Sequence, residues 1–263
     1  MNKYKLLEDL SELEKIEVAD LIQFTKKLDY DNEEIHLNIN SEIELNTRTI
    51  SCRKEPEVVD WIEENFKTMP EPVFYDIGAN IGAYSMVASK FCKQDITVYS
   101  FEPSFLNFYQ LNRNIILNNC ESSIIPLNIA LSSENALGEF NFSDLNTGSA
   151  AHAFGAAIDE TGEEFKPSKV SMMHCYRLDD LVSTFNFKQP NFIKIDVDGI
   201  EIEVLKGAKE TLSSHEMKGI IVEIVYEEDA KEFDDFLKPL GFNFVSRHEY
   251  TGASPGYNYI YSK

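Results

Sequence analysis

Five short apolar segments organise the chain from residue 72 onward, and four of them are followed by a segment whose apolar residues have helical spacing. Runs rich in β-branched and aromatic residues are typical of buried strands. Alternating strands and helices predict a doubly wound α/β fold with helices on both faces of the sheet. The predicted strands cover residues 72–77, 95–101, 122–131, 191–197 and 219–225, and residues 242–245 and 257–261 are expected to close the sheet as an antiparallel pair.

The first 70 residues carry a different pattern. Residues 4–28 repeat apolar positions at helical spacing, which predicts one or two helices that pack against the main domain, or that form a cap or a dimer surface. Residues 34–50 alternate and predict a small hairpin, and residues 58–66 predict an amphipathic helix. We therefore expect an N-terminal extension over residues 1–70 and a main domain over residues 71–263.

Residues 138–176 interrupt the regular alternation of strands and helices. The part over residues 146–157 is rich in Gly, Ala and Ser. An excursion of this length inside a compact domain is typical of a lid or a binding loop. It contains His152 and His174, two candidate general bases, although a lone histidine is more often structural or surface-exposed.

The charge composition narrows the classes of partner. The chain has 24 basic and 45 acidic residues and a formal net charge of −21. Its densest basic clusters are the pairs at 26–27 and 53–54, so binding to nucleic acids or anionic membranes is disfavoured. The four cysteines are far apart and lack metal-binding spacing, and no apolar run predicts a signal peptide or a membrane span. These features predict a soluble, cytoplasmic protein with reduced cysteines.

The clearest candidate site is the turn after the first predicted strand. Gly78 and Gly82 bracket this turn, and Asn80 stands where a dinucleotide-binding G-x-G-x-x-G motif has its second glycine. Asp76, at the end of the strand, adds a negative charge that would repel a phosphate and attract a cation. A ligand with a ribose, a cationic centre and no phosphate, such as S-adenosylmethionine, suits this turn better than a dinucleotide. An ordinary βα turn with two glycines is the alternative.

Two further segments would complete a nucleoside site. Glu102 follows Gly82 by about 20 positions, the place from which an acidic side chain accepts hydrogen bonds from ribose hydroxyls. A solvated carboxylate at a strand end is the alternative for Glu102. Asn128 and Ala130 stand at the end of the third predicted strand. An adenine edge would lie there in this arrangement, so both are candidate cofactor-binding residues.

A second acidic group stands at the end of the fourth predicted strand. Asp196, Asp198 and Glu201 cluster there, where α/β sheets place their ligands. They could orient a substrate hydroxyl, accept its proton, or hold a divalent cation such as Mg²⁺. Acidic stabilisation of a helix N-terminus is the alternative, and it leaves Asp196 unexplained. Glu223 lies in a run that should be buried, which indicates either a site residue or a partner of Lys194.

Four motifs in this order resemble one known family. They are Tyr-Asp-Ile-Gly-Ala-Asn-Ile-Gly at 75–82, Ser-Phe-Glu-Pro-Ser at 100–104, Arg-Leu-Asp-Asp-Leu at 177–181, and Lys-Ile-Asp-Val-Asp-Gly-Ile-Glu with Val-Leu-Lys-Gly at 194–207. The combination resembles the FkbM family of S-adenosylmethionine-dependent methyltransferases. The resemblance implies a class I methyltransferase fold with a mixed seven-stranded sheet. It also implies methylation, most often of a hydroxyl on a sugar, polyketide or other natural product.

The resemblance also assigns roles to residues. It implies a cofactor site lined by Asp76, Gly78, Asn80, Gly82 and Glu102. It places Asp196 near the methyl group. We hypothesise that Asp196, with Glu223 or a histidine such as His174, takes the proton there or holds a metal that lowers the pKa of the hydroxyl. Asp198 departs from the family, which more often has Glu before this glycine. The resulting pair, Asp196 and Asp198, resembles the metal-ligand pair of divalent-ion O-methyltransferases.

Two alternatives remain open at this point. Asn80 and Ala83 in the glycine turn oppose a nicotinamide-dependent oxidoreductase on a Rossmann-like fold. A non-catalytic binding or assembly module would keep the fold without turnover, and the presence of Asp76, Glu102 and Asp196 argues against it. A nucleic-acid methyltransferase is opposed by the charge of −21 and by the lack of an Asn/Asp-Pro-Pro-Tyr motif. We therefore expect a small-molecule or glycan acceptor.

Overall fold

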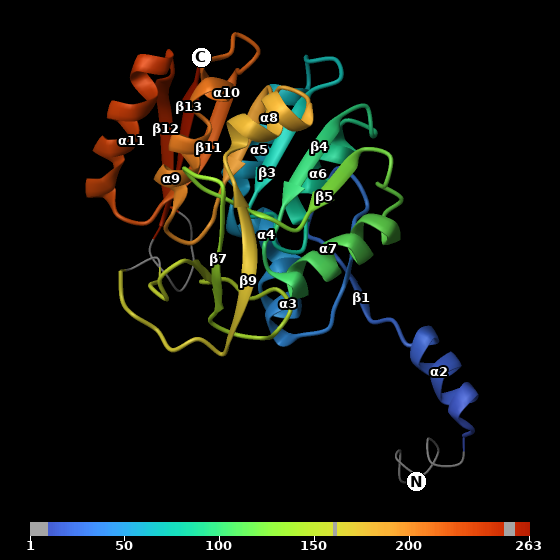
Figure 1. Ribbon diagram of the computed structural model, residues 1–263. Helices are drawn as coiled ribbons and strands as arrows, with labels where there is room; N and C mark the ends of the chain where they lie inside the picture. Colours follow the sequence, from blue (N-terminus) through green and yellow to red (C-terminus); the bar gives the residue numbers. More distant parts are fainter. Residues whose placement is uncertain (1–9, 160–161, 250–255) are drawn as a thin grey trace.

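A seven-stranded sheet forms the centre of the protein (Figure 1). The computed structural model describes residues 10–159, 162–249 and 256–263. Five strands run parallel and β13 runs antiparallel to both of its neighbours, which confirms the predicted sheet and its C-terminal pair. In order across the sheet, the strands are β12 (Asn243–Glu249), β13 (Tyr257–Ser262), β11 (Gly219–Ile224), β10 (Phe192–Ile195), β3 (Val73–Ile77), β4 (Thr97–Phe101) and β5 (Ile124–Leu127).

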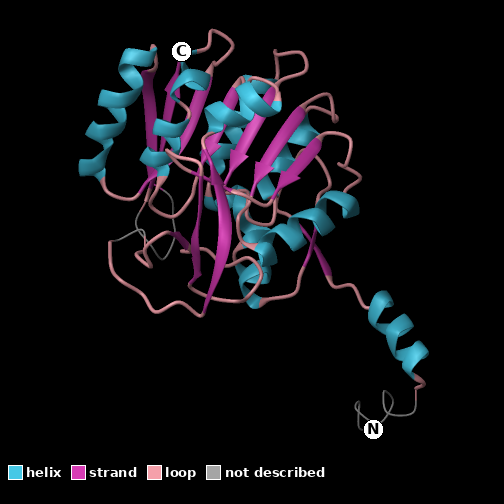
Figure 2. Ribbon diagram, in the orientation of Figure 1, coloured by secondary structure: helices cyan, strands magenta, loops and turns pink. Residues whose placement is uncertain are grey.

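Helices cover both faces of this sheet (Figure 2). Side chains alternate along each strand, so Phe74 of β3 enters one core and Tyr75 enters the other. The core on the Phe74 side is closed by α5 (Pro56–Phe66), α6 (Ala83–Phe91) and α7 (Phe105–Leu117). The core on the Tyr75 side is closed by α8 (Leu178–Phe185), α9 (Glu201–Gly207), α10 (Lys209–Ser213) and α11 (Ala230–Leu237), with the short helices η2 (Glu227–Asp229) and η3 (Lys238–Leu240) flanking α11.

The first described helix, α2 (Glu12–Leu21), projects away from the body of the protein (Figure 1). Its side chains Leu13 and Ile16 are 67% and 59% exposed. The prediction that the apolar positions of residues 4–28 pack against the main domain is therefore wrong for these two side chains of α2, whereas Leu28 is fully buried. Residues 4–9 lie outside the described residues.

The predicted hairpin over residues 34–50 is half right. β2 (His36–Asn38) is a strand, but it pairs with the preceding β1 (Thr25–Lys27). Ser41 and Glu44 form a reciprocal capping box, in which each side chain accepts a hydrogen bond from the backbone N–H of the other. This Ser-x-x-Glu signal begins a helix because it satisfies free backbone donors. The chain continues through α3 (Glu42–Asn46), η1 (Arg48–Ile50) and α4 (Ser51–Lys54).

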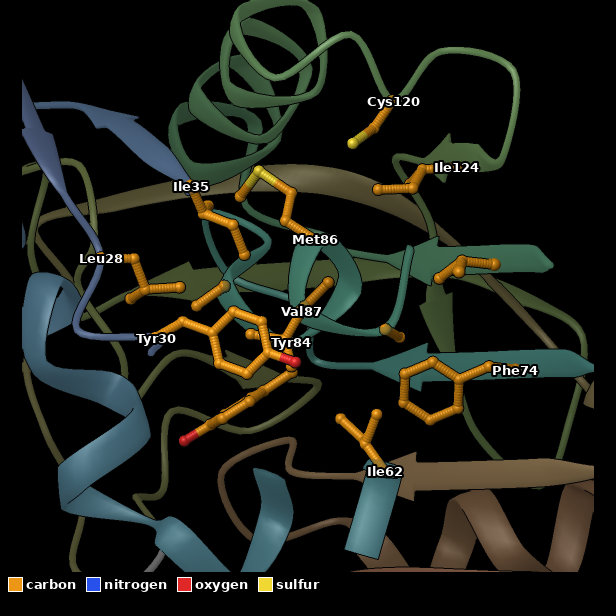
Figure 3. Close-up of a cluster of buried hydrophobic side chains, with 14 of the residues drawn as sticks. Leu28, Tyr30, Ile35, Ile62, Phe74, Tyr84, Met86, Val87, Cys120 and Ile124 are labelled. Carbon is orange, nitrogen blue, oxygen red and sulfur yellow. The ribbon is translucent and has the colours of Figure 1, made fainter. Parts of the chain in front are cut away.

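From residue 28 onward, the N-terminal segment shares its core with the central sheet. Leu28 and Ile35 are fully buried, and they belong to one cluster with Ile62 of α5 and Phe74 of β3 (Figure 3). Residues 28–66 therefore bury their apolar side chains against the domain that we expected to begin at residue 71.

The excursion predicted over residues 138–176 forms a second sheet. Phe140, Phe142 and Met173 make a small core of their own within it. The order of its four strands is β6 (Ala130–Leu131), β9 (Lys169–Tyr176), β7 (Ala136–Phe142) and β8 (Ala153–Phe154). This sheet lies beside the carboxyl ends of the central parallel strands (Figure 2).

The order of the central strands indicates where a ligand would bind. β3 has β4 on one side and β10 on the other, so the direction of winding reverses there. Open α/β sheets bind ligands at the carboxyl ends of strands at such a switch point. In the part of the chain that the structure describes, no helix is long and apolar enough to cross a membrane.

Candidate functional site

A cleft opens at this switch point, between the carboxyl ends of the central strands and the second sheet. It encloses about 490 Å³ of empty space, including its open mouth. Six parts of the chain supply its walls: Arg48 from η1, Gly78 and Asn80 after β3, Glu102 and Pro103 after β4, Asn107 of α7, Phe140, Ser149, Ala150 and His152 from the second sheet and its loop, and Asp196, Val197 and Asp198 after β10.

The glycine turn brings two strand ends into contact. Gly78 has φ of +81°, and a Cβ on it would lie 1.7 Å from the backbone oxygen of Asp196. Asn80 is also left-handed, with φ of +50°, and its Nδ2 donates to the Ser149 carbonyl at 2.9 Å. Gly82 lies under α7, where a Cβ would meet Leu111 Cδ1 at 2.4 Å. Gly78 and Asn80 therefore form the cleft wall, and Gly82 sets the start of α6.

Glu102 lies at the cleft as predicted, buried at 5% exposure. Its carboxylate accepts hydrogen bonds from the backbone N–H groups of Asn80 (2.7 Å) and Ser104 (2.8 Å). Burial raises the pKa of Glu102 to about 7, against the opposing effect of those hydrogen bonds. Glu102 therefore joins the two turns that follow β3 and β4.

The residues that follow β5 contribute a side-chain amide and an apolar wall to the surroundings of the cleft. The Asn128 side chain turns toward the preceding turn, where its Nδ2 donates to the carbonyls of Glu102 (2.8 Å) and Pro103 (2.9 Å). Ala130 lines an apolar pocket that adjoins the cleft and has about 350 Å³ of empty space, together with Ile129. Of the two predicted residues, Ala130 borders a cavity and Asn128 holds the turn that carries Glu102.

Asp76 lies beneath the cleft and is almost fully buried. It accepts a hydrogen bond from Ser85 Oγ at 2.5 Å, and its Oδ1 lies 3.9 Å from Lys194 Nζ. Burial raises its pKa above the usual range, although the charge of Lys194 opposes this. Asp76 therefore belongs to the floor under the glycine turn, and Lys194 separates it from Asp196.

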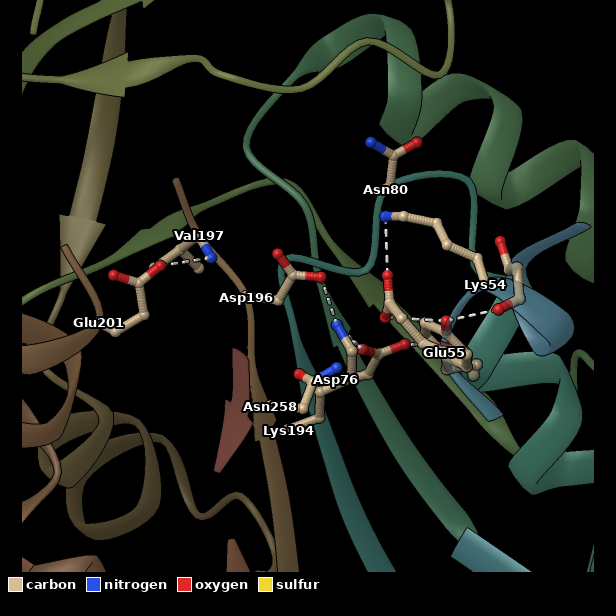
Figure 4. A network of polar contacts seen from close by, with 12 residues as sticks. Lys54, Glu55, Asp76, Asn80, Lys194, Asp196, Val197, Glu201 and Asn258 are labelled. Carbon is tan, nitrogen blue, oxygen red and sulfur yellow. Dashed lines mark hydrogen bonds and ion pairs between the residues drawn. The ribbon is translucent and has the colours of Figure 1, made fainter. Parts of the chain in front are cut away.

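Asp196 combines a cleft position with a buried cation. Lys194 Nζ donates to its Oδ2 at 2.9 Å, and Figure 4 shows this contact beside Asp76. Burial opposes the charge of Asp196, but Lys194 and a hydrogen bond with Glu223 outweigh it and hold the pKa of Asp196 below its usual range. The partner of Glu223 is thus Asp196, whereas Lys194, which the sequence suggested, forms ion pairs with Asp196 and Asp76.

The other two carboxylates after β10 have separate roles. Asp198 borders the cleft with φ of +61°, and its Oδ2 accepts a hydrogen bond from the His152 backbone at 3.3 Å. Glu201 accepts from the backbone N–H groups of Val197 and Gly199, both at 3.1 Å, and so stabilises the start of α9. Among the described residues no group of three or more His, Cys, Asp or Glu side chains could hold a metal ion. Since Mg²⁺ is often held by only one or two carboxylates together with water, the magnesium site at Asp196 and Asp198 stays a prediction.

The two histidines of the excursion lie in different places. His174 is exposed on β9, with its ring 6.1 Å from that of Tyr176, so its prediction as a cleft base is wrong. His152 borders both the cleft and the apolar pocket. The Ser143 backbone N–H donates to His152 Nδ1 at 3.3 Å, which assigns the proton of the neutral ring to Nε2. Burial lowers the pKa of His152 to about 4, so it offers a hydrogen-bond donor rather than a base.

Two cleft residues, Arg48 and Asn107, escaped the sequence interpretation. Arg48 Nε donates to the Gly148 carbonyl at 2.9 Å across 100 positions of the chain. Asn107 accepts from the Gly148 N–H at 2.7 Å and donates to the Ser149 carbonyl at 2.9 Å. No local pattern marks these residues because their partners are distant in the chain. The small residues at 146–157 were the one available signal.

The fold is that of a class I methyltransferase. The structure is similar to that of the METTL16 MTase domain, with a TM-score of 0.52 and 10% sequence identity, over 81% of this chain and 69% of that chain. The Methyltransferase FkbM domain matches residues 76–244, so the chain belongs to the FkbM methyltransferase family. This confirms the resemblance, and a methyltransferase is favoured over the nicotinamide-dependent oxidoreductase.

Two curated relatives are methyltransferases. Hexuronic acid methyltransferase AglP of Haloferax volcanii is 30% identical over 191 residues, which cover 72% of this chain and 70% of the relative. Methyltransferase sdnD of Sordaria araneosa is 27% identical over 159 residues, which cover 53% of this chain and 61% of the relative.

Proposed function

We propose that this protein methylates a hydroxyl of a sugar, of the hexuronic acid kind named for AglP. The observation that carries the proposal is the placement of Glu102 and Asp196 on one cleft, on either side of Gly78. One carboxylate suits a ribose and the other suits an acceptor hydroxyl. Glu102 follows β4 and Asp196 follows β10, the two strands that flank β3, and these positions would bring the two substrates together.

The cleft fits S-adenosylmethionine in the character of its walls. The apolar pocket at Ile129 and Ala130 suits an adenine ring, and the buried carboxylate of Glu102 suits ribose hydroxyls. Asp196 and Asp198 suit a positive centre in the cleft beside them. When bound, the cofactor supplies a methyl group on a sulfonium. We assign no step to a metal.

Asp196 would act on the acceptor. The ion pair with Lys194 keeps Asp196 ionised, so its carboxylate can accept the hydrogen bond of an acceptor hydroxyl and orient it. As the carbon–oxygen bond forms and the carbon–sulfur bond breaks, the hydroxyl proton would pass to this carboxylate. Its lowered pKa makes Asp196 a weak base, so alignment would supply most of the acceleration. Asp198 and His152 would line the acceptor side.

Binding and turnover test this function separately. We expect calorimetry to detect S-adenosylhomocysteine binding, and mass spectrometry to detect methylation of a glucuronide when S-adenosylmethionine is present. No binding at high micromolar ligand would refute the cofactor assignment. Binding without methylation of any sugar or polyketide hydroxyl would favour the non-catalytic module, and methylation of a polyketide alone would replace the sugar acceptor.

A further inference from the structure

The N-terminal segment contributes a cation to the cleft. Arg48 lies outside residues 76–244, the part that matches the family. It borders both the main cleft and a smaller pocket behind Asn80. Its Nε donates to the Gly148 carbonyl at 2.9 Å, and Gly148 lies so close to it that an added Cβ would meet Arg48 Cγ at 3.4 Å. The guanidinium is therefore held in place at the wall.

Arg48 differs from the other cations near the cleft. Lys194 Nζ lies 2.9 Å from Asp196, and Lys54 Nζ lies 2.8 Å from Glu55 (Figure 4). Within residues 10–159, 162–249 and 256–263, the Nη atoms of Arg48 have neither a hydrogen bond nor an ion pair. In a chain of net charge −21, a cleft cation whose Nη atoms form no ion pair among these residues is available for an anionic ligand.

We propose that Arg48 binds a carboxylate of a ligand in this cleft. With Nε already bonded to the chain, the two Nη groups present a planar fork that matches a carboxylate. The charge of Arg48 also acts on the cleft, since it lowers the pKa of both Glu102 and His152. The inference rests on the proposed function, which supplies two sources of carboxylate. They are the amino-acid part of S-adenosylmethionine and the acid group of a hexuronic acid acceptor.

The test compares ligands with and without a carboxylate in the Arg48→Gln and Arg48→Lys variants. S-Adenosylhomocysteine carries the amino-acid carboxylate and 5′-methylthioadenosine lacks it, and both are titrated by calorimetry. A glucuronide and the matching glucoside are compared by kcat/KM at saturating S-adenosylmethionine. The control is Arg53→Gln, because Arg53 lies on the neighbouring α4 with a side chain that is 70% exposed.

Loss of the two Nη groups should lower the affinity for the carboxylate ligand by about tenfold to a hundredfold. A cofactor carboxylate predicts weaker S-adenosylhomocysteine binding with unchanged 5′-methylthioadenosine binding. An acceptor carboxylate predicts a lower kcat/KM for the glucuronide alone. The inference is overturned if the variants have wild-type affinity and kcat/KM for all ligands. It is also overturned if both members of each ligand pair are affected equally, as a collapse of the loop at Gly148 would cause. Failure of wild type to bind S-adenosylhomocysteine would instead refute the proposed function itself.

Discussion

One wall of the cleft, built from residues 78–103, differs from the opposite wall in how far apart its contacting residues lie in the chain. In the first wall, Glu102 holds the turn at Asn80 across 22 positions. In the second wall, Arg48 meets Gly148 across 100 positions. The first wall follows from two adjacent strands of one sheet, whereas the second exists only when the N-terminal segment and the second sheet meet. The first wall is therefore local in sequence and the second wall is not.

The largest effect is expected from Gly78→Ala. The added Cβ would lie 1.7 Å from the Asp196 oxygen at φ of +81°, so the turn and the end of β10 must separate. We expect loss of activity and a fall of about 3 kcal/mol or more in the free energy of unfolding, measured by urea denaturation.

Gly155→Ala, next to β8 of the second sheet, is the matched control. Gly155 has φ of +89°, but no atom of the described residues lies within 4 Å of its added Cβ. The cost should be about 1 to 2 kcal/mol, from the backbone conformation alone. Equal losses in the two variants would contradict the tighter construction of the first wall.

Asp196→Asn should lower kcat by about a hundredfold or more, because the variant keeps the shape of the side chain but cannot accept the proton. Affinity for S-adenosylhomocysteine, measured by calorimetry, should change far less. Asp198→Asn is the comparison and should have the smaller effect on kcat. Undiminished turnover in Asp196→Asn would remove Asp196 from the mechanism. If EDTA abolished activity and Mg²⁺ restored it, the predicted metal site would be supported.

Glu102 should make cofactor binding depend on pH. In the proposed cofactor site, the ionised carboxylate is the form that would accept hydrogen bonds from both ribose hydroxyls, and the pKa of Glu102 is raised to about 7. As pH falls below 7, binding must displace a proton, so the dissociation constant of S-adenosylhomocysteine should rise by up to about tenfold per pH unit. Calorimetry at pH 6, 7 and 8 checks this. Glu102→Gln should bind more weakly and show a flat profile; an equally steep profile would assign the proton to another group.

The two histidines of the second sheet should differ in acid stability. The pKa of buried His152 is lowered to about 4 from 6.5, so its contribution to stability is present above pH 6.5 and is lost as pH falls toward 4. The full loss amounts to about 3 kcal/mol. His152→Gln should therefore flatten the fall in stability between pH 6.5 and 4, measured by urea denaturation. His174→Gln should show the same fall in stability as wild type. The reverse result would contradict the burial of His152 and the exposure of His174.

The smallest effect on activity is expected at α2. Leu13 and Ile16 are largely exposed on this projecting helix, which keeps the predicted homodimer as a prediction. We expect light scattering to show a dimer that Leu13→Glu with Ile16→Glu converts to a monomer, with kcat unchanged. A monomeric wild type would refute the dimer.

The sequence predicted the central sheet well because each strand is a short apolar run with a clear end. It also placed Gly78, Asn80, Glu102 and Asp196 correctly at one cleft. It failed at residues 34–50, where the capping box of α3 overrides a brief alternation. It also failed for His174, because the alternation of side chains along β9 does not indicate which face of the second sheet meets the cleft.

By itself, the sequence determined the βαβ architecture, the glycine turn and the carboxylates at the strand ends. These features depend on local periodicity and on the rule that parallel strands share their carboxyl edge. Only the tertiary structure decided that Asp76 is buried beneath the glycine turn, that Lys194 keeps Asp196 ionised, and that Arg48 borders the cleft. Burial and charge pairing are properties of atoms brought together from distant positions, so no local pattern encodes them.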